Sequence, residues 1–282
     1  MKLFILVALA MMAFAANSVL TRVGVAHYAM DPVAFAVIRV AAGALTLALL
    51  VAARRASPFT DITSRWRGAL ALAIYMLGFS WAYLSLGAGL GALILFGVLQ
   101  VIMFGWAVWR GQSIPLMRWI GAIFAIVGLV VLLWPTQAFS VPFFGTVSMI
   151  VATIGWAAYT ILGQGARDPL RATAGNFILC LPIVALALLA GTDGEFAQGG
   201  VISAIVAGSL SSGIGYAIWY RVLPQLATTV AAVAQLSVPV IAVIAGVLFL
   251  GEPLSARLVI AGALVIGGIA LSNVKWAPAG RI

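Results

Sequence analysis

Charged side chains are scarce in this chain of 282 residues, where they make up only 7% of the sequence. Cysteine and histidine occur once each. The single Cys180 excludes a disulfide framework, and one histidine with one cysteine leaves too few ligands for the usual zinc or transition-metal sites. We therefore expect no metal and no cofactor.

Motifs for enzymatic chemistry are missing too. His27 has no partners for a Ser-His-Asp triad. The sequence also contains no phosphate-binding P-loop of the kind that an ATPase uses. These absences predict a protein that is not an enzyme and that does not hydrolyse ATP.

Apolar residues are what the chain has in excess: they make up 65% of it, and the mean hydropathy is +1.21. A soluble domain of this length cannot bury so much apolar surface. Crossing a hydrocarbon core of ~30 Å takes roughly 20 apolar residues as a helix, whereas a β-barrel alternates over segments of about 10 residues. The long apolar runs predict an all-α membrane protein with ten transmembrane helices. We expect these spans at residues 3–21, 33–53, 67–86, 91–109, 117–134, 143–164, 170–190, 201–223, 227–249 and 256–274.

The few positive charges are sorted between alternate gaps of that pattern. Of the 15 Lys and Arg residues, 12 lie in every second gap or at the two termini. These are Lys2, Arg54, Arg55, Arg65, Arg67, Arg110, Arg118, Arg167, Arg171, Arg221, Lys275 and Arg281. The positive-inside rule then predicts that both termini are cytoplasmic. The net charge of +9 therefore reflects orientation in a lipid bilayer, of the bacterial inner-membrane kind, and not nucleic-acid binding.

The beginning of the chain has a second interpretation. Lys2, the following apolar run and Ala13-Phe14-Ala15 resemble a secretory signal peptide with its cleavage site. Removing that segment would break the alternation of charges over the nine later spans. We therefore interpret it as the first span.

Three short patterns recur in the two halves of the chain. Asp31-Pro32 matches Asp168-Pro169 at a shift of 137 residues, and the pattern G-[FY]-x-x-x-Y-x-x-L recurs from Gly78 and from Gly215 at the same shift. Gly111-Gln112 corresponds to Gly251-Glu252 at a shift of 140. The shift moves each span by five, so corresponding helices cross the membrane in opposite directions. We therefore predict two inverted five-helix repeats, residues 1–139 and 140–282, an architecture that recurs in secondary transporters.

The second half also carries the features of a known family. The segments Gly215-Tyr216-Ala217-Ile218-Trp219-Tyr220-Arg221, Gln235-Leu236-Ser237-Val238-Pro239 and Leu250-Gly251-Glu252-Pro253-Leu254-Ser255 resemble the second half of the EamA-type branch of the drug/metabolite transporter superfamily. The first half resembles the same unit more loosely, with Gly111-Gln112 where the family usually has Gly-Glu. Within the superfamily the chain is most similar to aromatic amino acid exporters.

This resemblance implies ten helices arranged as five plus five and export of amino acids, aromatic ones included, or of related small metabolites. Two alternatives stay open, a multidrug or organic-cation exporter and a membrane scaffold subunit that transports nothing. The predicted spans contain no carboxylate near their middle, and proton-coupled carriers usually titrate such a group. We therefore expect a uniporter or an exchanger. The sequence does not predict an oligomeric state.

One cation, Arg39, lies inside a predicted span, where a charge costs about 2.5–3.5 kcal/mol even on the lenient insertion scale. It could contact a substrate carboxylate. Alternatively, its side chain could extend to the outer interface, or pair with Asp31 or with a carbonyl group at a helix end.

Neutral polar and aromatic side chains supply the other candidates for a substrate site. Gln100, Gln235, Asn17 and Asn176 carry amides that lipid cannot satisfy, so they serve a polar substrate or bond neighbouring helices. A larger group of aromatic residues could form the wall of a pocket for flat or apolar groups, although packing is the default role of each. This group consists of Tyr75, Trp81, Tyr83, Trp106, Trp156, Tyr159, Tyr216 and Trp219.

Prolines and glycines mark expected bends. Pro182 and Pro239 each remove a backbone hydrogen bond from a predicted span and allow a kink. Gly213 and Gly215 permit close packing or a hinge in the eighth span. Asp31 and Asp168 each precede a proline, which is typical of a helix N-cap followed by proline at the first helical position.

Overall fold

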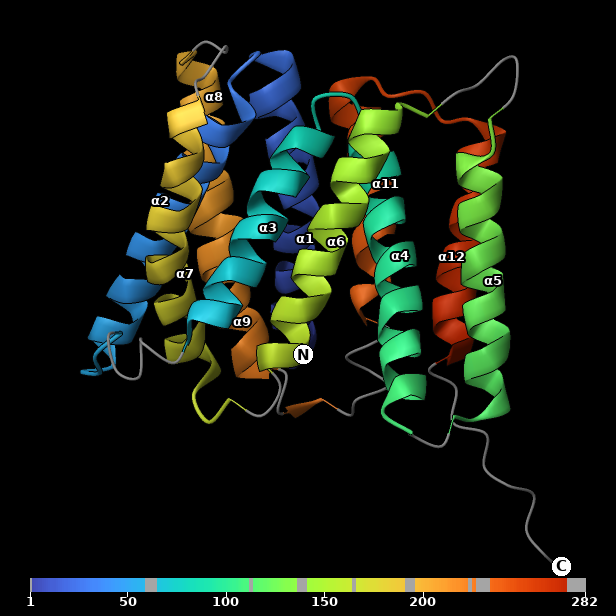
Figure 1. The fold of residues 1–282 in the computed structure, drawn as a ribbon, viewed down its shortest axis with the longest axis horizontal. Coiled ribbons are helices and arrows are strands. Elements are labelled where there is room, and N and C mark those ends of the chain that lie inside the picture. Colours follow the sequence, from blue (N-terminus) through green and yellow to red (C-terminus); the bar gives the residue numbers. More distant parts are fainter. Residues whose placement is uncertain are drawn as a thin grey trace, which may run out of the picture.

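The computed structural model describes residues 2–58, 65–111, 114–135, 141–163, 166–190, 196–222, 225–226 and 234–272. Within these ranges the regular elements are helices that stand side by side (Figure 1). Elements that follow one another without a break are counted as one helical rod, which gives ten rods within these ranges. In chain order they are α1 (Lys2–Arg22) with η1 (Val23–His27), α2 (Pro32–Ala53), α3 (Trp66–Ala82), α4 (Ala88–Trp109), α5 (Leu116–Leu133), α6 (Phe143–Gly163), α7 (Pro169–Leu186) with η3 (Ala187–Ala190), α8 (Gln198–Val206) with η4 (Ala207–Ile214) and α9 (Gly215–Val222), α11 (Ser237–Leu250) and α12 (Ala256–Ser272).

The structure confirms the all-helical membrane class, and each predicted span overlaps one rod. Seven rods are long and apolar enough to cross a membrane. The described parts of α3, α11 and α12 have 17, 14 and 17 residues. For these three, spanning stays a prediction. Several sequence features lie outside the described residues, namely Gln112, Lys275, Arg281 and the start of the predicted span at 227–233; the side chain of Tyr220 is not described either.

The two Asp-Pro pairs begin helices as expected. A carboxylate oxygen of Asp31 accepts a hydrogen bond from the backbone N–H of Ala34 at 2.8 Å, and Asp168 accepts one from Arg171 at 3.1 Å. In both helices proline follows at the first position. The N-cap interpretation is confirmed, since these side chains satisfy N–H groups that have no partner inside the helix.

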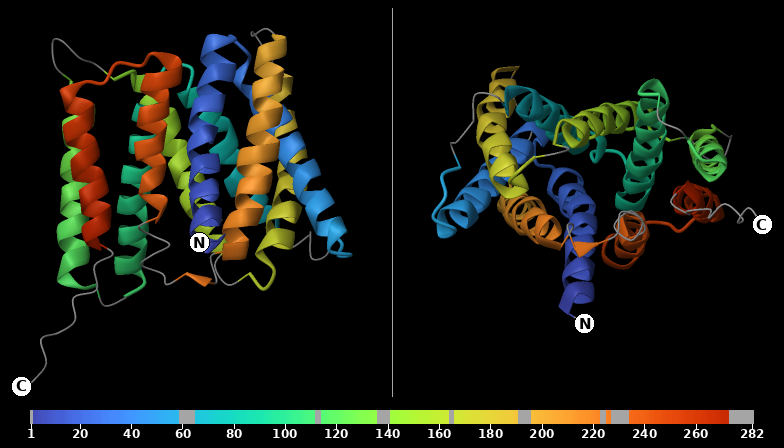
Figure 2. Two further views of the ribbon diagram at one scale, coloured as in Figure 1. Left: turned by 180° about the vertical axis from the view of Figure 1, so that it is seen from behind. Right: turned by 90° about the horizontal axis from the view of Figure 1, so that it is seen from below.

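The helices of the two halves interlock. α6 packs against α3 and α4, while α1 packs against α8, η4, α9 and α11. Helices α2 and α7, α4 and α11, and α5 and α12 meet as pairs, each with one member from either half. The pair of α5 and α12 stands at one side of the bundle (Figures 1 and 2). The first helix of each half therefore packs mainly on the other half.

Close approach of α5 and α12 depends on glycine. A Cβ atom on Gly121 would overlap the carbonyl oxygen of Gly268 and lie 2.8 Å from the backbone nitrogen of Ser272. In a membrane, where apolar burial gives little drive for helix association, such close backbone contact is what holds two helices together.

We expect Gly121→Leu to destabilise the fold by about 1–3 kcal/mol, because the side chain would force α5 away from α12. Gly105→Leu is the matched control, since nothing lies within 4 Å of an added Cβ there. Thermal unfolding in detergent would measure both. Equal melting temperatures for the two variants would contradict the role assigned to Gly121.

Three of the four predicted bend positions lie where a helix is irregular, and the fourth, Pro182, does not. Gly213 lies in the π-helical stretch η4, and Gly215 follows it directly. Pro182 lies inside α7, which continues to Leu186. Pro239 lies in the first turn of α11, where it has no N–H to donate to the carbonyl of Gln235, and the helical pattern is interrupted at Leu236. Hinge motion at these positions stays a prediction.

The two ends of the bundle differ in charge. Helices α1, α3, α5 and α7 begin at one end, at the bottom of Figure 1, and α12 ends there. Many exposed cations lie at these helix ends, and we call it the basic end. They are Lys2, Arg54, Arg55, Arg67, Arg110, Arg118, Arg167 and Arg221. The opposite end, called the far end, carries Arg22, Asp31, Glu252 and Arg257.

Candidate functional site

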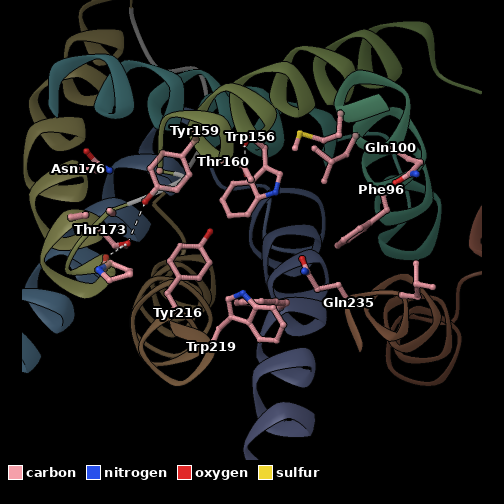
Figure 3. Close-up of a pocket in the computed structure, with 18 of the residues that line it drawn as sticks. Phe96, Gln100, Trp156, Tyr159, Thr160, Thr173, Asn176, Tyr216, Trp219 and Gln235 are labelled. Carbon is pink, nitrogen blue, oxygen red and sulfur yellow. Dashed lines mark hydrogen bonds between the residues drawn. The ribbon is translucent and has the colours of Figure 1, made fainter. Parts of the chain in front are cut away.

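A cavity of about 560 Å³ lies between the helices of both halves and is called the central cavity (Figure 3). Side chains of α1, α4, α6, α7, α9 and α12 line it, together with the segment before α11. Its wall extends to Gly163, Ala166 and Pro169, at the connection between α6 and α7. The cavity therefore reaches the basic end.

Aromatic rings form one wall of this cavity. The ring of Trp156 on α6 lies 5.6 Å from that of Tyr159 and 5.8 Å from that of Tyr216, both nearly parallel at 27°. Trp219, one turn after Tyr216 on α9, meets Phe14 of α1 edge-on at 6.1 Å. Pairs spaced by three residues on α6 and on α9 thus present their flat faces to one space. Such a surface suits a planar or apolar group.

Polar side chains lie around the same space. Gln235, Asn176 and Thr160 line it. Gln100 lines it as well, and its Nε2 donates to Ser272 Oγ of α12 at 2.8 Å. Gln100 therefore bonds two helices while bordering the cavity. Its contact with a substrate stays a prediction.

A smaller cavity of about 60 Å³, called the inner pocket, lies on the far-end side of the central cavity. The two share Trp156, Tyr216 and Gln235 among their lining residues. The inner pocket is also lined by Asn17, Ser18, Tyr75, Phe79, Ser211 and Ser212. Asn17 Nδ2 donates to the hydroxyl oxygen of Tyr75 at 3.2 Å, which fixes the amide toward the pocket.

Arg39 is fully buried next to the inner pocket, with 0% of its side chain exposed. Its Nε donates to Ser212 Oγ at 3.4 Å, and its guanidinium carbon lies 5.1 Å from the ring centre of Phe79 and 5.6 Å from that of Tyr75. The side chain does not extend to the interface, and Asp31 is occupied with its own helix. The interpretation that Arg39 reaches the outer interface is therefore wrong.

Three of the predicted site residues lie away from both cavities. Trp81 meets the ring of Phe144 edge-on at 5.7 Å. Trp106 lies on α4 beside Trp109, with the Arg110 guanidinium 5.7 Å from its ring centre. Tyr83 is buried at the end of α3, where its hydroxyl donates to the carbonyl of Ala88 at 3.4 Å.

Several cavity residues were not predicted from the sequence. Phe14, Phe96, Met103, Thr160 and Thr173 line the central cavity. Each is an ordinary residue of a transmembrane helix, and no motif distinguishes it. Ser211 and Ser212, which line the inner pocket, are small residues that no motif distinguishes either.

Contacts between the halves lie at the far end. Glu252, after α11, accepts hydrogen bonds from the backbone N–H groups of Ala88 at 2.6 Å and Gly89 at 3.3 Å, at the N-terminus of α4. A carboxylate there also interacts favourably with the helix dipole. Close by, Tyr83 and Leu86 are fully buried. Among the described residues, the wall of the central cavity thus reaches the basic end, whereas Glu252 joins the two halves at the far end.

Each cation at the far end bonds helix C-termini. Arg22 donates to the carbonyl oxygens of Tyr83 and Leu84, at 2.8 Å each, just after α3. Arg257 donates to the carbonyl of Val131 at 2.6 Å and also contacts that of Trp134, at the end of α5. These bonds satisfy carbonyl groups that have no partner inside their helices.

Comparisons with known proteins agree with this architecture. The EamA-like transporter family matches residues 143–274. The uncharacterized protein PA1977 of Pseudomonas aeruginosa is 44% identical over 271 residues, covering 96% of this chain and 94% of that protein. An uncharacterized transporter of Archaeoglobus fulgidus is 26% identical and covers 85% of this chain and 88% of its own length. A solved crystal structure shares the fold, with a TM-score of 0.69 at 18% identity and coverage of 96% and 97%.

Proposed function

Because this chain belongs to the EamA-like transporter family, we propose that it is a secondary carrier that moves small metabolites by alternating access between two inverted five-helix halves. The observation that supports this best is the central cavity: helices of both halves line it, it reaches the basic end, and Glu252 joins the halves at the other end. A carrier in one of its two access states has this arrangement.

The packing supports the inverted repeat of residues 1–139 and 140–282. Matching helices take matching places: α3 packs on α6 as α8, η4 and α9 pack on α1, and α4 packs on α6 as α11 packs on α1. If the basic end is cytoplasmic, as the positive-inside rule predicts for a bacterial inner-membrane protein, the cavity faces the cytoplasm. The structure would then be the inward-open state.

The lining favours amino acids, aromatic ones included, as substrates, and we propose that the carrier exports them. The rings of Trp156, Tyr159, Tyr216 and Trp219 offer flat faces for an apolar side chain, and Gln235 and Asn176 offer hydrogen bonds for a polar group. Organic cations are the rival class, because aromatic faces also attract cations. The carboxylates of Asp31 and Glu252 lie at helix ends and already bond backbone N–H groups. This favours uniport or exchange over proton coupling.

The purified protein in liposomes tests this proposal. We expect saturable counterflow of phenylalanine or tryptophan, with no accumulation driven by an imposed pH gradient. Liposomes without protein are the control. Uphill accumulation driven by the pH gradient would refute uniport and exchange, flux of organic cations alone would refute the amino acid proposal, and absence of any saturable flux would leave the scaffold role.

A further inference from the structure

The buried charge of Arg39 has no counter-ion within the residues that the structure describes. Both terminal nitrogens of its guanidinium are buried and have no hydrogen-bond partner within the described part of the chain. A buried guanidinium in a transmembrane helix is normally paired or fully hydrogen-bonded. The weak bond from Nε to Ser212 and the faces of two rings replace only part of what water would supply.

The side chains that meet the guanidinium through its hydrogen bond and its two ring contacts also line the inner pocket. Ser212, Tyr75 and Phe79 separate Arg39 from that space. The charge therefore lies directly behind the pocket wall. Small rotations of Ser212 or Tyr75 would expose it to a bound molecule.

The inner pocket holds two further unpartnered polar atoms. Asn17 Oδ1 and Ser211 Oγ are buried without a hydrogen-bond partner among the described residues. Both residues line this pocket. Buried polar atoms are rarely left unsatisfied, so a hydroxyl, an amide oxygen and a guanidinium around one small space indicate a polar ligand group.

Resting on the proposed function, we propose that the inner pocket binds the carboxylate of the transported substrate, with Arg39 as its counter-ion. The planar guanidinium fork matches a carboxylate. The Oδ1 atom of Asn17 accepts a hydrogen bond from the ammonium group of an amino acid, and the side chain extends along Trp156 into the central cavity. The substrates are therefore carboxylates, and amines that lack the carboxylate are excluded.

Three compounds that share one aromatic ring but differ in their charged groups test the proposal on the wild-type protein. Phenylalanine and 3-phenylpropionate carry the carboxylate, whereas phenethylamine carries only the ammonium group. We expect the first two to compete for counterflow, and phenethylamine to bind at least about 30-fold more weakly. Equal recognition of phenethylamine and phenylalanine would leave a working carrier and overturn the role of Arg39. Absence of saturable flux would instead overturn the carrier itself.

Substitutions at Arg39 supply a second test. Arg39→Met should weaken phenylalanine binding at least about 30-fold and raise the melting temperature of the empty protein, because an unpaired buried charge is removed. Arg39→Lys keeps the charge without the fork and should weaken binding about tenfold. Arg118→Gln, at an exposed arginine of the basic end, should change neither quantity. Phenylalanine affinity within twofold of wild type in Arg39→Lys and Arg39→Met would overturn the proposal.

Chloride is the other small anion that could pair with Arg39. The counterflow series is therefore repeated with sulfate in place of chloride. Unchanged phenylalanine affinity supports the substrate carboxylate as the counter-ion. Binding of phenethylamine that depends on chloride would assign the site to chloride and overturn the proposal.

Discussion

Replacing Trp156 with alanine is expected to weaken binding of an aromatic amino acid by roughly 30- to 100-fold, as truncation of a central aromatic anchor does. Trp156 lines both cavities, and its ring contacts those of Tyr75, Tyr159 and Tyr216 at 5.0 to 5.8 Å. Its removal takes away a surface for the substrate and loosens the rings around it. Equilibrium binding of radiolabelled phenylalanine to the purified protein measures the effect.

Trp106→Ala is the matched control. Trp106 was predicted from the sequence to belong to the same aromatic wall, but it lies beside Trp109 and Arg110, outside both cavities. We expect its replacement to leave the affinity within about twofold of wild type, as surface substitutions do. Trp156→Phe should give an intermediate loss. Equal losses in Trp106→Ala and Trp156→Ala would contradict the central cavity as the binding site.

Glu252→Ala is expected to shift the carrier away from the state described here. Glu252 joins the segment after α11 to the N-terminus of α4, so its two hydrogen bonds link the halves at the far end. A partly buried carboxylate at a helix N-terminus contributes up to ~2 kcal/mol, and about 1.4 kcal/mol changes a two-state ratio tenfold. We expect the population whose cavity is open at the basic end to fall about tenfold relative to the population whose cavity is closed there. The population ratio of Glu252→Gln should lie between those of the wild type and Glu252→Ala.

The Thr173→Cys substitution introduces a cysteine whose rate of labelling by a soluble maleimide reports this shift. Thr173 lines the central cavity toward the basic end, and the native Cys180 is buried, so its background is low. The matched control is Asp31→Asn, since Asp31 also caps a helix at the far end, but its side chain bonds within its own half in the part of the chain that the structure describes. An unchanged labelling rate in Glu252→Ala, or an equal shift in Asp31→Asn, would show that the contact does not hold the far end closed.

Composition and charge order predicted the class and the rods because bilayer thickness prescribes the length of a helix, whatever its neighbours are. The same reasoning placed the caps at Asp31 and Asp168, since a cap depends only on nearby residues. The start of α11 at Ser237 was not foreseen, although Pro239 indicated a bend in that region.

The aromatic candidates divided in a way that no pattern in the sequence indicates. Trp156 and Tyr216 face the cavity, whereas Trp81 and Trp106 face other surfaces. In a helix at the surface of a soluble protein, the polar face is exposed to water, so the opposite, apolar face identifies the side that points inward. These helices are apolar on most of their surface, so rotation about each axis is decided by contacts with neighbouring helices.

The direction of the Arg39 side chain was likewise left open by the sequence and is decided by packing. Its position in α2 permitted two directions for a long side chain, outward to the interface or inward to the bundle. Packing against Phe79, Tyr75 and Ser212 directs it inward. The first two residues come from the first half of the chain and the third from the second half.

By itself, the sequence determined that this protein is a helical membrane protein with its cations gathered at one end, because hydrophobic length and charge act on each segment separately. Only the tertiary structure decided which side chains surround the cavities, that Arg39 is buried without a counter-ion among the described residues, and that Glu252 joins the two halves at the far end. These properties arise from contacts between residues up to 173 positions apart, such as Arg39 and Ser212. Such contacts exist only once the two halves have packed together.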